Sequence, residues 1–162
     1  MGTEAMTALS KTIRSLKSEN ANGQGVQEQK WLQNHLIEPA LQALVPKLSI
    51  IALHILSALL TEPKTGIELA TQLEVTRGGI TRAAKKLADY QLITAQKRPD
   101  DQKKIYYTLT STGQTIAQTH DQMHQALKTQ VIDALVQKYS SADIQIVDQF
   151  LKDLMAYEQR FY

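Results

Sequence analysis

The sequence predicts a mainly α-helical protein whose middle carries two short helices followed by a β-hairpin. Apolar residues recur at helical spacing along most of the 162 residues. The exceptions are two segments rich in β-branched and aromatic residues, 92–97 and 104–109, on either side of a polar tip. Apolar residues make up 43% of the chain and charged residues 21%, which is ordinary for a folded domain and excludes overall disorder.

The segments before this middle region predict helices. Residues 3–17 show helical spacing, and the polar, glycine-containing segment 18–25 is expected to be a loop. A longer helical segment follows, in which we expect Pro39 to kink the helix and Pro46 to close it. Residues 48–60 are apolar nearly all round, so they predict a buried helix.

Two short helices joined by a tight turn are predicted next. Thr65 is a candidate N-cap for the first helix and Thr76 for the second, with a turn at Glu74-Val75 between them. This is the pattern of a helix-turn-helix. The hairpin that follows, with residues 98–101 at its tip, is expected to be a two-stranded β wing. The predicted fold is therefore a winged helix-turn-helix.

Two amphipathic helices are predicted after residue 110, a long one and a final one. The final helix is so apolar that it must pack against something, and a second subunit is the usual partner. We therefore expect a homodimer. Residues 1–47 and 111–162 are expected to form a helical dimerisation domain, and residues 48–110 a winged DNA-binding domain.

Positive charge is concentrated in the middle of the chain. The formal net charge is only +2, but residues 77–104 hold eight Lys and Arg against three Asp. The stretch 48–60 is too short to cross a bilayer and the start of the sequence lacks a signal-peptide pattern, so we expect a cytoplasmic protein that does not enter a membrane. The absence of cysteine excludes disulfides and thiolate metal ligands.

The second short helix has the composition of a helix that enters the major groove of double-stranded DNA. Its leading turn combines cations with short side chains that let the backbone approach base edges. The pair Gly78-Gly79 lowers helix propensity by about 1 kcal/mol per glycine, a cost that close approach to DNA can justify. The candidate contacts are Arg77, Gly78, Thr81 and Arg82 in the groove, Lys85 and Lys86 nearer the phosphates, and Arg98 and Lys103 on the wing.

Taken singly, these segments are as well explained by a solvated helix face and a solvated hairpin tip. The order of the elements favours DNA binding, because a helix, a short helix, a basic helix and a basic hairpin together match few other architectures. A winged module that binds only protein stays open as an alternative.

The four histidines indicate a metal site. His120 and His124 are four residues apart on a predicted helix, a spacing at which both imidazoles can hold one ion. His54 lies in the buried helix, where an imidazole without a partner is costly. For any one histidine a structural role is the commoner explanation. Together with His35, however, they make a set from which a tetrahedral zinc site could be built.

Residues 48–113 resemble the winged-helix core of the MarR family. In that family the wing tip carries an Asp-x-Arg motif, and the next strand ends in Leu-Thr with a glycine soon after. This sequence has Asp101-Gln102-Lys103, then Leu109-Thr110 and Gly113. Lys103 keeps the charge of the arginine without its planar fork, so the resemblance implies a weaker grip on the minor groove.

The histidines resemble those of the zinc-responsive AdcR/ZitR branch of this family. That branch has a histidine in a His-Ile-Leu motif, here His54-Ile55-Leu56, and two histidines four apart on the helix after the wing, here His120 and His124. Its fourth ligand is a glutamate directly after a histidine on the first helix. Alignment without gaps puts His35 on that histidine and a leucine on the glutamate, so either His35 or Glu38 is expected to ligate, and we favour His35.

The resemblance implies one zinc ion per protomer and zinc-dependent repression of metal-uptake genes at a palindromic operator. The rival expectation is a generic MarR-type repressor that a small aromatic or anionic effector releases from DNA. An enzyme that uses His120 or His124 as a base is disfavoured, because no positioned nucleophile or glutamate lies beside the pair in the sequence.

Overall fold

The computed structural model describes residues 2–22 and 24–160, with side chains for 4–16 and 25–160. The chain divides into two compact units, Met1–Met123 and His124–Tyr162. The division falls inside one uninterrupted helix, α7, which spans Ser111–Lys138.

Helix α1 spans Gly2–Asn22 and helix α2 spans Gln24–His35. The prediction of a loop over 18–25 is therefore wrong for residues 18–22, 24 and 25, and Gly23 lies outside the described residues. Residues 18–22 contain neither proline nor glycine. Serine and asparagine disfavour a helix by only a few tenths of a kcal/mol each, which does not suffice to end one.

Pro39 begins a helix instead of kinking one. Helix α2 ends at His35, and α3 spans Pro39–Leu44 with the proline in its first turn, where a missing N–H costs nothing. The short 3-10 turn η1, Val45–Lys47, contains Pro46 and follows directly. The amide of Gln42 donates to the carbonyl of Leu36 at 2.7 Å and bridges the break between α2 and α3.

The predicted buried helix and helix-turn-helix are confirmed. Helix α4, Ile50–Ala58, is capped by Ser49, and α5, Gly66–Gln72, by Thr65. Helix α6, Arg77–Asp89, begins at Thr76, whose hydroxyl accepts from the backbone N–H of Gly79 at 3.1 Å. The turn before α6 places Glu74 at a φ of 54°, the left-handed conformation that tightens it.

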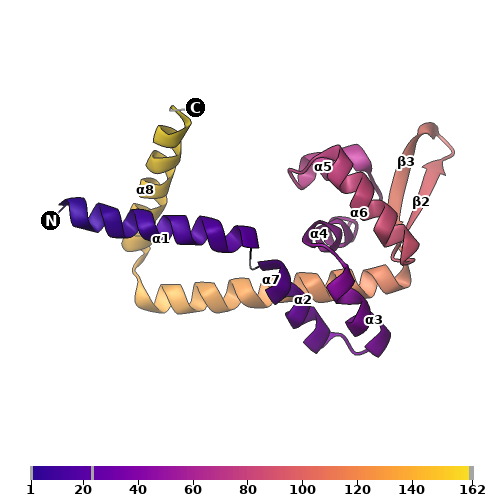
Figure 1. Cartoon of the computed structure of the whole chain (residues 1–162), viewed down its shortest axis with the longest axis horizontal. Helices are drawn as coiled ribbons and strands as arrows, with labels where there is room; N and C mark the ends of the chain where they lie inside the picture. Colours follow the sequence, from indigo (N-terminus) through magenta and orange to yellow (C-terminus); the bar gives the residue numbers. More distant parts are fainter. Residues whose placement is uncertain (1, 23, 161–162) are drawn as a thin grey trace. The chain divides into compact units, whose positions relative to one another are not determined.

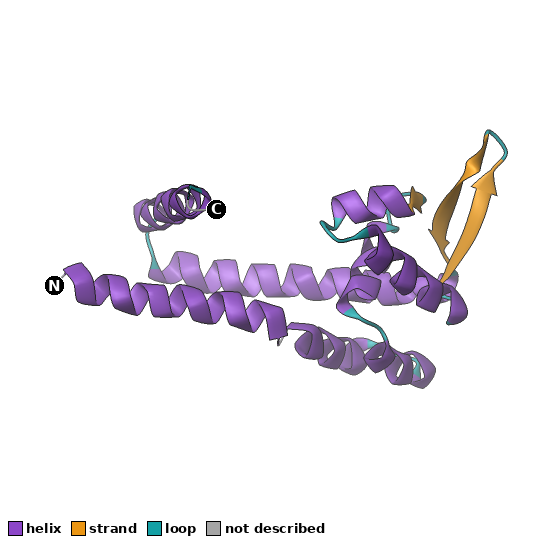
Figure 2. Cartoon of the chain, turned by 45° about the horizontal axis from the view of Figure 1, so that its top comes forward, coloured by secondary structure: helices purple, strands orange, loops and turns teal. Residues whose placement is uncertain are grey.

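The hairpin is confirmed, and it belongs to a three-stranded sheet. Strands β2, Ile93–Arg98, and β3, Asp101–Leu109, form the wing, which projects from the helices (Figure 2). Strand β1, Lys64–Thr65, pairs with the other edge of β3, giving the order β1-β3-β2. The sequence predicted two strands only, because two residues are too few to show alternation.

The predicted helices after the wing are also confirmed. In the second unit, the end of α7 is followed by α8, Ser141–Gln159, which is capped by Ser140. Many large apolar side chains of this unit are exposed in the single chain, among them Leu127, Val131, Leu135, Val147 and Leu151.

One apolar core joins the elements of the first unit around α4 (Figure 1). Leu53, Ile55 and Leu56 of α4 are completely buried, and the core extends from Leu32 of α2 to Ala117 of α7. The core thus crosses both expected domain boundaries, after residues 47 and 110. The division into dimerisation and DNA-binding domains stays a prediction.

Within the described residues, no single helix is long and apolar enough to span a membrane. The segments Pro39–Lys47 and Ile50–Ala58 reach that length and composition only as a pair, with a bend of 119° between them.

We predict that Gly113→Ala destabilises the protein. A Cβ at Gly113 would lie 1.9 Å from the carbonyl oxygen of Leu92, so the backbone must move, a strain of about 1–3 kcal/mol or more. At Gly78 a Cβ would meet nothing within 4 Å, so Gly78→Ala should stabilise α6 by about 0.5–1 kcal/mol. Urea unfolding of both variants tests this, and equal midpoints would contradict it.

We also predict an acid-dependent contribution from the cap of α5. The backbone N–H and the hydroxyl of Thr65 donate to the Glu68 carboxylate at 2.7 and 2.8 Å and hold its pKa below the usual value. The resulting stabilisation is complete above the unfolded pKa of about 4.3 and is lost as the pH falls through the lowered folded pKa. It is small because Glu68 is exposed.

Thr65→Ala should move the pKa of Glu68 back toward its ordinary value in an NMR titration. It should also cost about 0.5–2 kcal/mol of stability through loss of the cap. Thr65→Ser, which keeps the hydroxyl, is the control, and an unchanged pKa in Thr65→Ala would refute this account of the cap.

Candidate metal centre and nucleic-acid interface

Side chains from α2, α4 and α7 meet at one place in the first unit. Nε2 of His120 on α7 lies 3.1 Å from Oε2 of Glu28 on α2. The ring of His54 on α4 lies 5.4 Å from the His120 ring, centroid to centroid, with the planes tilted by 49°. Helices α2 and α7 run side by side here, which brings residues 92 positions apart in the sequence into contact (Figure 2).

His124 follows one turn after His120 on the same helix. One ligand atom from each of Glu28, His54, His120 and His124 lies within 4.8 Å of the other three. Burial falls steadily across the group. His120 is fully buried and Glu28 is 9% exposed, whereas His54 is half-buried and His124 is exposed.

The donor set fits zinc. Zinc takes imidazole nitrogen and carboxylate oxygen at about 2.0–2.2 Å in a tetrahedron, which sets neighbouring ligand atoms about 3.4 Å apart. The four ligand atoms are already within 4.8 Å of one another. Side-chain rotations that move these atoms by about 1 Å would bring them to the separation found in a tetrahedral zinc site. Three histidines and one carboxylate also suit nickel, cobalt or copper.

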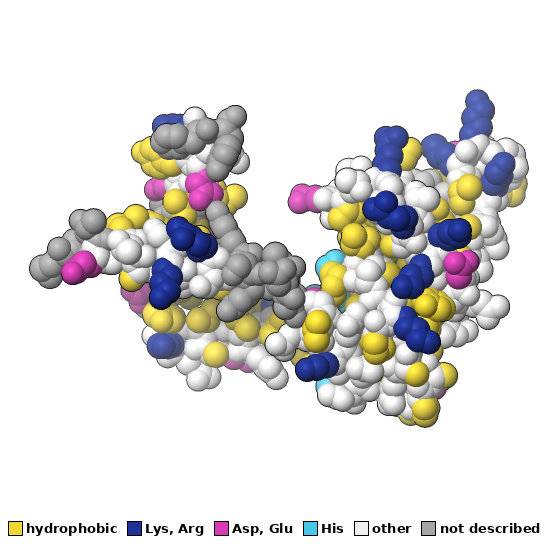
Figure 3. Space-filling model, in the orientation of Figure 1, with side chains coloured by type: hydrophobic (Ala, Val, Ile, Leu, Met, Phe, Trp, Pro, Cys, Tyr) yellow, Lys and Arg dark blue, Asp and Glu magenta, His cyan; other side chains and the backbone are white. Residues whose placement is uncertain are grey.

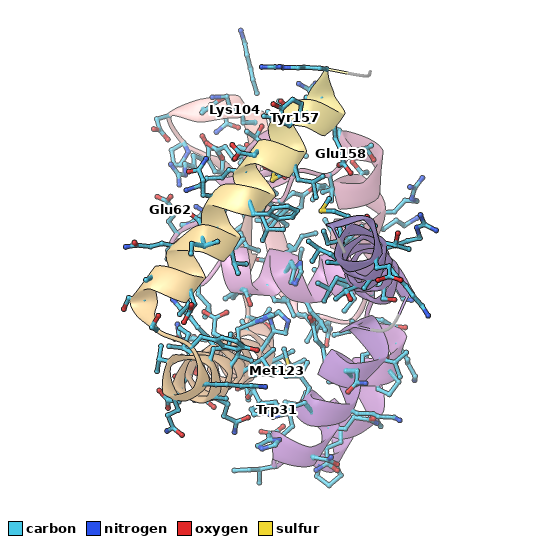
Figure 4. The ribbon with its side chains drawn as sticks, turned by 90° about the vertical axis from the view of Figure 1, so that its left-hand side faces the viewer. Trp31, Glu62, Lys104, Met123, Tyr157 and Glu158 are labelled. Atoms are coloured by element: carbon cyan, nitrogen blue, oxygen red, sulfur yellow. The ribbon has the colours of Figure 1, made fainter. Side chains whose placement is uncertain are left out.

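Of the expected ligands, the structure brings together His54, His120 and His124, and it places His35 and Glu38 elsewhere. His35 is exposed, its ring stacks on Trp31 at 3.6 Å, and its Nδ1 lies 2.8 Å from the Trp31 carbonyl oxygen. Figure 4 labels Trp31 on α2. Glu38 is exposed in the turn before α3. The position expected for His35 or Glu38 is taken by Glu28.

Glu28 is not among the ligands predicted from the sequence, because the alignment without gaps points to residues 35–38. A signal was nevertheless present in the sequence. Glu28 and Leu32 are four residues apart, so they share one face of α2, and Leu36, directly after the helix, continues the same spacing; both leucines are buried. A carboxylate in phase with an apolar stripe needs a buried partner, and that is the pattern expected of a ligand or an ion pair.

The expected DNA contacts lie on the exposed faces of α6 and the wing. Figure 3 shows Lys and Arg side chains spread over the part of the surface formed by α5, α6 and the wing. Thr81 donates its hydroxyl hydrogen to the carbonyl of Arg77 at 2.9 Å, so its oxygen stays available as an acceptor. The exposed candidates on these elements are Arg77, Gly78, Thr81, Arg82, Lys85, Lys86, Arg98 and Lys103.

Two contacts organise the cations of the wing. The guanidinium of Arg98 lies 3.9 Å from the centroid of the Tyr106 ring on the neighbouring strand. Asp101 accepts from the backbone N–H groups of Lys103 and Lys104 at 3.1 and 3.3 Å, which shapes the turn. Its carboxylate also bonds the side chain of Lys104 and raises the pKa of that amine, so Lys104 is held charged.

A shallow groove of about 470 Å³ separates the start of α6 from strand β3. Its walls include Arg77 and Thr81 on one side and Lys103 and Lys104 on the other. Glu68 of α5 and several apolar side chains line it as well, so cations of α6 and of the wing lie around one shared groove.

Helix α4 connects the histidine group to α6. It contributes His54 to the group, and it also packs on α6, where a Cβ at Gly79 would lie 4.0 Å from Cδ1 of Ile51. Just before α4, the amide of Gln29, next to Glu28, donates to the carbonyl of Leu48 at 2.7 Å. Helix α4 therefore contacts both the histidine group and the first turn of α6.

The chain is similar in sequence to known transcriptional regulators. The MarR family model matches residues 48–105. The transcriptional regulator AdcR of Streptococcus pyogenes is 31% identical over 119 residues, which cover 74% of this chain and 80% of AdcR. The uncharacterized HTH-type transcriptional regulator YvnA of Bacillus subtilis is 32% identical over 99 residues. That match covers 60% of this chain and 62% of YvnA, so the chain spans less than two thirds of that relative.

Among solved structures, Lactococcus lactis ZitR, described as a zinc-responsive MarR family member, superposes with a TM-score of 0.73 at 21% identity. The match covers 94% of this chain and 98% of ZitR. ZitR in complex with DNA gives a TM-score of 0.61 at 24% identity over 68% of this chain and 75% of that one. At such identities the two structures show the winged-helix fold alone. The match to AdcR along most of both sequences goes further, and with it we conclude that the chain belongs to the MarR family.

Proposed function

We propose that this chain is a zinc-responsive, DNA-binding transcriptional repressor. The observation that carries the proposal is the group Glu28, His54, His120 and His124, built into a chain that also has a winged helix-turn-helix. The similarity to AdcR, a transcriptional regulator, and to ZitR, a zinc-responsive one, supports it. The protein is a regulator and not an enzyme, and it acts in the cytoplasm, where the DNA lies.

The proposed stoichiometry is one zinc ion per protomer. Bound zinc supplies a positive charge that four ligands from three helices can share, which fixes α2, α4 and α7 relative to one another. Glu28 and the histidines hold the ion in place of water. Repression of metal-uptake genes is the proposed outcome, because it limits zinc entry when zinc is abundant.

The proposed DNA target is a palindrome read by a homodimer. Regulators of the MarR family bind DNA as dimers, and the apolar side chains exposed on α7 and α8 of the second unit suit a contact between two copies. Two copies related by a twofold axis present two α6 helices to successive major grooves.

Coupling between zinc and DNA runs through α4 in this proposal. Holding His54 against Glu28 and His120 restrains α4, and α4 in turn supports the first turn of α6. Zinc can favour DNA binding only to the extent that it binds the DNA-competent arrangement more tightly, and DNA must raise zinc affinity by the same factor.

We predict that Glu28→Gln weakens zinc binding by tenfold or more, because the amide lacks the carboxylate charge. Glu38→Gln is the matched control, because it makes the same chemical change at an exposed glutamate outside the group. Competition with a chelating dye measures both. Loss of zinc in Glu38→Gln or in His35→Ala, with Glu28→Gln unchanged, would overturn the ligand set proposed here.

We predict that Gly78→Ala weakens operator binding although it stabilises α6. A methyl group on the exposed first turn keeps the backbone from the bases and costs about 1–3 kcal/mol, the worth of one good base contact. Phosphate contacts are untouched, so the dependence of log K on log salt keeps its slope. Lys85→Ala makes that negative slope shallower by about 0.9 for each protomer of the dimer, because each protomer loses one phosphate contact. Fluorescence anisotropy at several salt concentrations separates the two, and full affinity in Gly78→Ala would count against close approach at this glycine.

Operator titrations with and without zinc separate this function from its rival, because a zinc-responsive repressor binds more tightly when zinc is present. A repressor that is released by an aromatic or anionic effector binds its operator equally well with and without zinc, and dissociates when the effector is added.

A further inference from the structure

A hydroxyl group touches the central imidazole on the side away from Glu28. Ser57 Oγ lies 2.8 Å from Nδ1 of His120, whereas Glu28 Oε2 lies 3.1 Å from Nε2 of the same ring. Ser57 is on α4, three residues after His54, so the two share one face of that helix. Both ring nitrogens of the fully buried His120 are thus in contact with a polar atom.

For a neutral His120 ring beside an ionised Glu28 carboxylate, these contacts set which nitrogen carries the proton when the site holds no metal. An ionised carboxylate can only accept, so the hydrogen bond to Glu28 requires the proton on Nε2. A neutral ring then has its lone pair on Nδ1. Ser57 must therefore donate its hydroxyl hydrogen to Nδ1.

Ligation reverses both roles. Because Nε2 is the nitrogen that faces Glu28, it is the atom that would hold zinc; its lone pair would then be used, and the ring proton would be on Nδ1. Nδ1–H then donates to Ser57 Oγ. One proton leaves Nε2 and one is gained at Nδ1, so the ring stays neutral. Ser57 keeps its hydroxyl hydrogen, which turns to another acceptor, for a helical serine commonly a backbone carbonyl one turn earlier.

We infer that Ser57 is a positioning residue for zinc binding, whose hydroxyl donates to His120 in the metal-free protein and accepts from it in the zinc-bound protein. The His120 ring thereby keeps one orientation in both states, and the site is assembled before the ion arrives. This inference rests on the zinc site of the proposed function. A residue with a fixed polarity, such as a carbonyl or an ammonium, cannot serve both states.

The test uses the full-length protein and the variants Ser57→Ala, Ser57→Thr and Thr119→Ala. Thr119→Ala is the matched control, because that residue adjoins His120 but its hydroxyl donates to the carbonyl of Thr115 at 2.9 Å. Zinc affinity is measured by chelator competition without DNA. Long-range ¹H–¹⁵N spectra of the His120 ring report which nitrogen is protonated, and thermal unfolding of the metal-free variants checks that each is folded.

We expect Ser57→Ala to raise the zinc dissociation constant about 10–100-fold, the usual effect of removing a partner of a ligating histidine. Ser57→Thr, which restores a hydroxyl, and Thr119→Ala should both bind zinc like the unsubstituted protein. In the unsubstituted protein the His120 proton should be on Nε2 without zinc and on Nδ1 with zinc.

Two results would overturn the inference alone: zinc binding by Ser57→Ala at full affinity, or a proton on Nδ1 in both states. If the unsubstituted protein binds no zinc, the proposed function fails first and the role of Ser57 fails with it.

Discussion

The burial of one imidazole is the constraint on which the rest of the site depends. His120 has no exposed surface, and an unpaired imidazole there would cost several kcal/mol. Its two nitrogens face Glu28 of α2 and Ser57 of α4. Because α7 carries the ring, three helices must take up one arrangement for it to be satisfied. The apolar core around Leu53, Ile55 and Leu56 holds that arrangement in place.

The same short helix, α4, contributes both to the apolar core and to the histidine group. Its apolar residues form the centre of the core, and its two polar side chains, His54 and Ser57, meet α7. Another part of the helix supports α6, which carries the proposed DNA contacts. A change in the histidine group and a change at the DNA surface therefore act on the same nine-residue helix, Ile50–Ala58. Such sharing provides the short route that coupling between two sites requires.

Much of the fold could be predicted from the sequence, because local signals decide it. Thr65 and Thr76 cap the helices that their positions indicated, and the polar tip at 98–101 closes the hairpin. The errors arose where a weak signal was overvalued. The polar composition of residues 18–22 predicts a loop, but nothing in it breaks a helix, and Pro39 begins a helix instead of interrupting one.

Only part of the candidate site could be predicted, because spacing within one helix shows which of its residues share a face but not which residues of another helix meet them. The spacing of His120 and His124 places them on one helical face, and the sequence itself contains that information. The partner from α2 depends on how two helices pack, which no spacing within one helix can show. Glu28 and His35 are seven residues apart, about two turns, yet one is buried in the group and the other stacks on Trp31 in solvent. Ser57 could not be singled out without knowing the position of Nδ1.

The central claim is that the histidine group and the DNA surface are coupled, and reciprocal titration tests it most directly. DNA affinity is measured with and without zinc, and zinc affinity with and without a palindromic operator from the promoter of the gene itself. The account predicts the same factor in both, within the range of about 5–150-fold that such couplings usually show. Tight zinc binding with a factor of one in both titrations would contradict it, and would make the group a structural metal site in a repressor controlled by another signal.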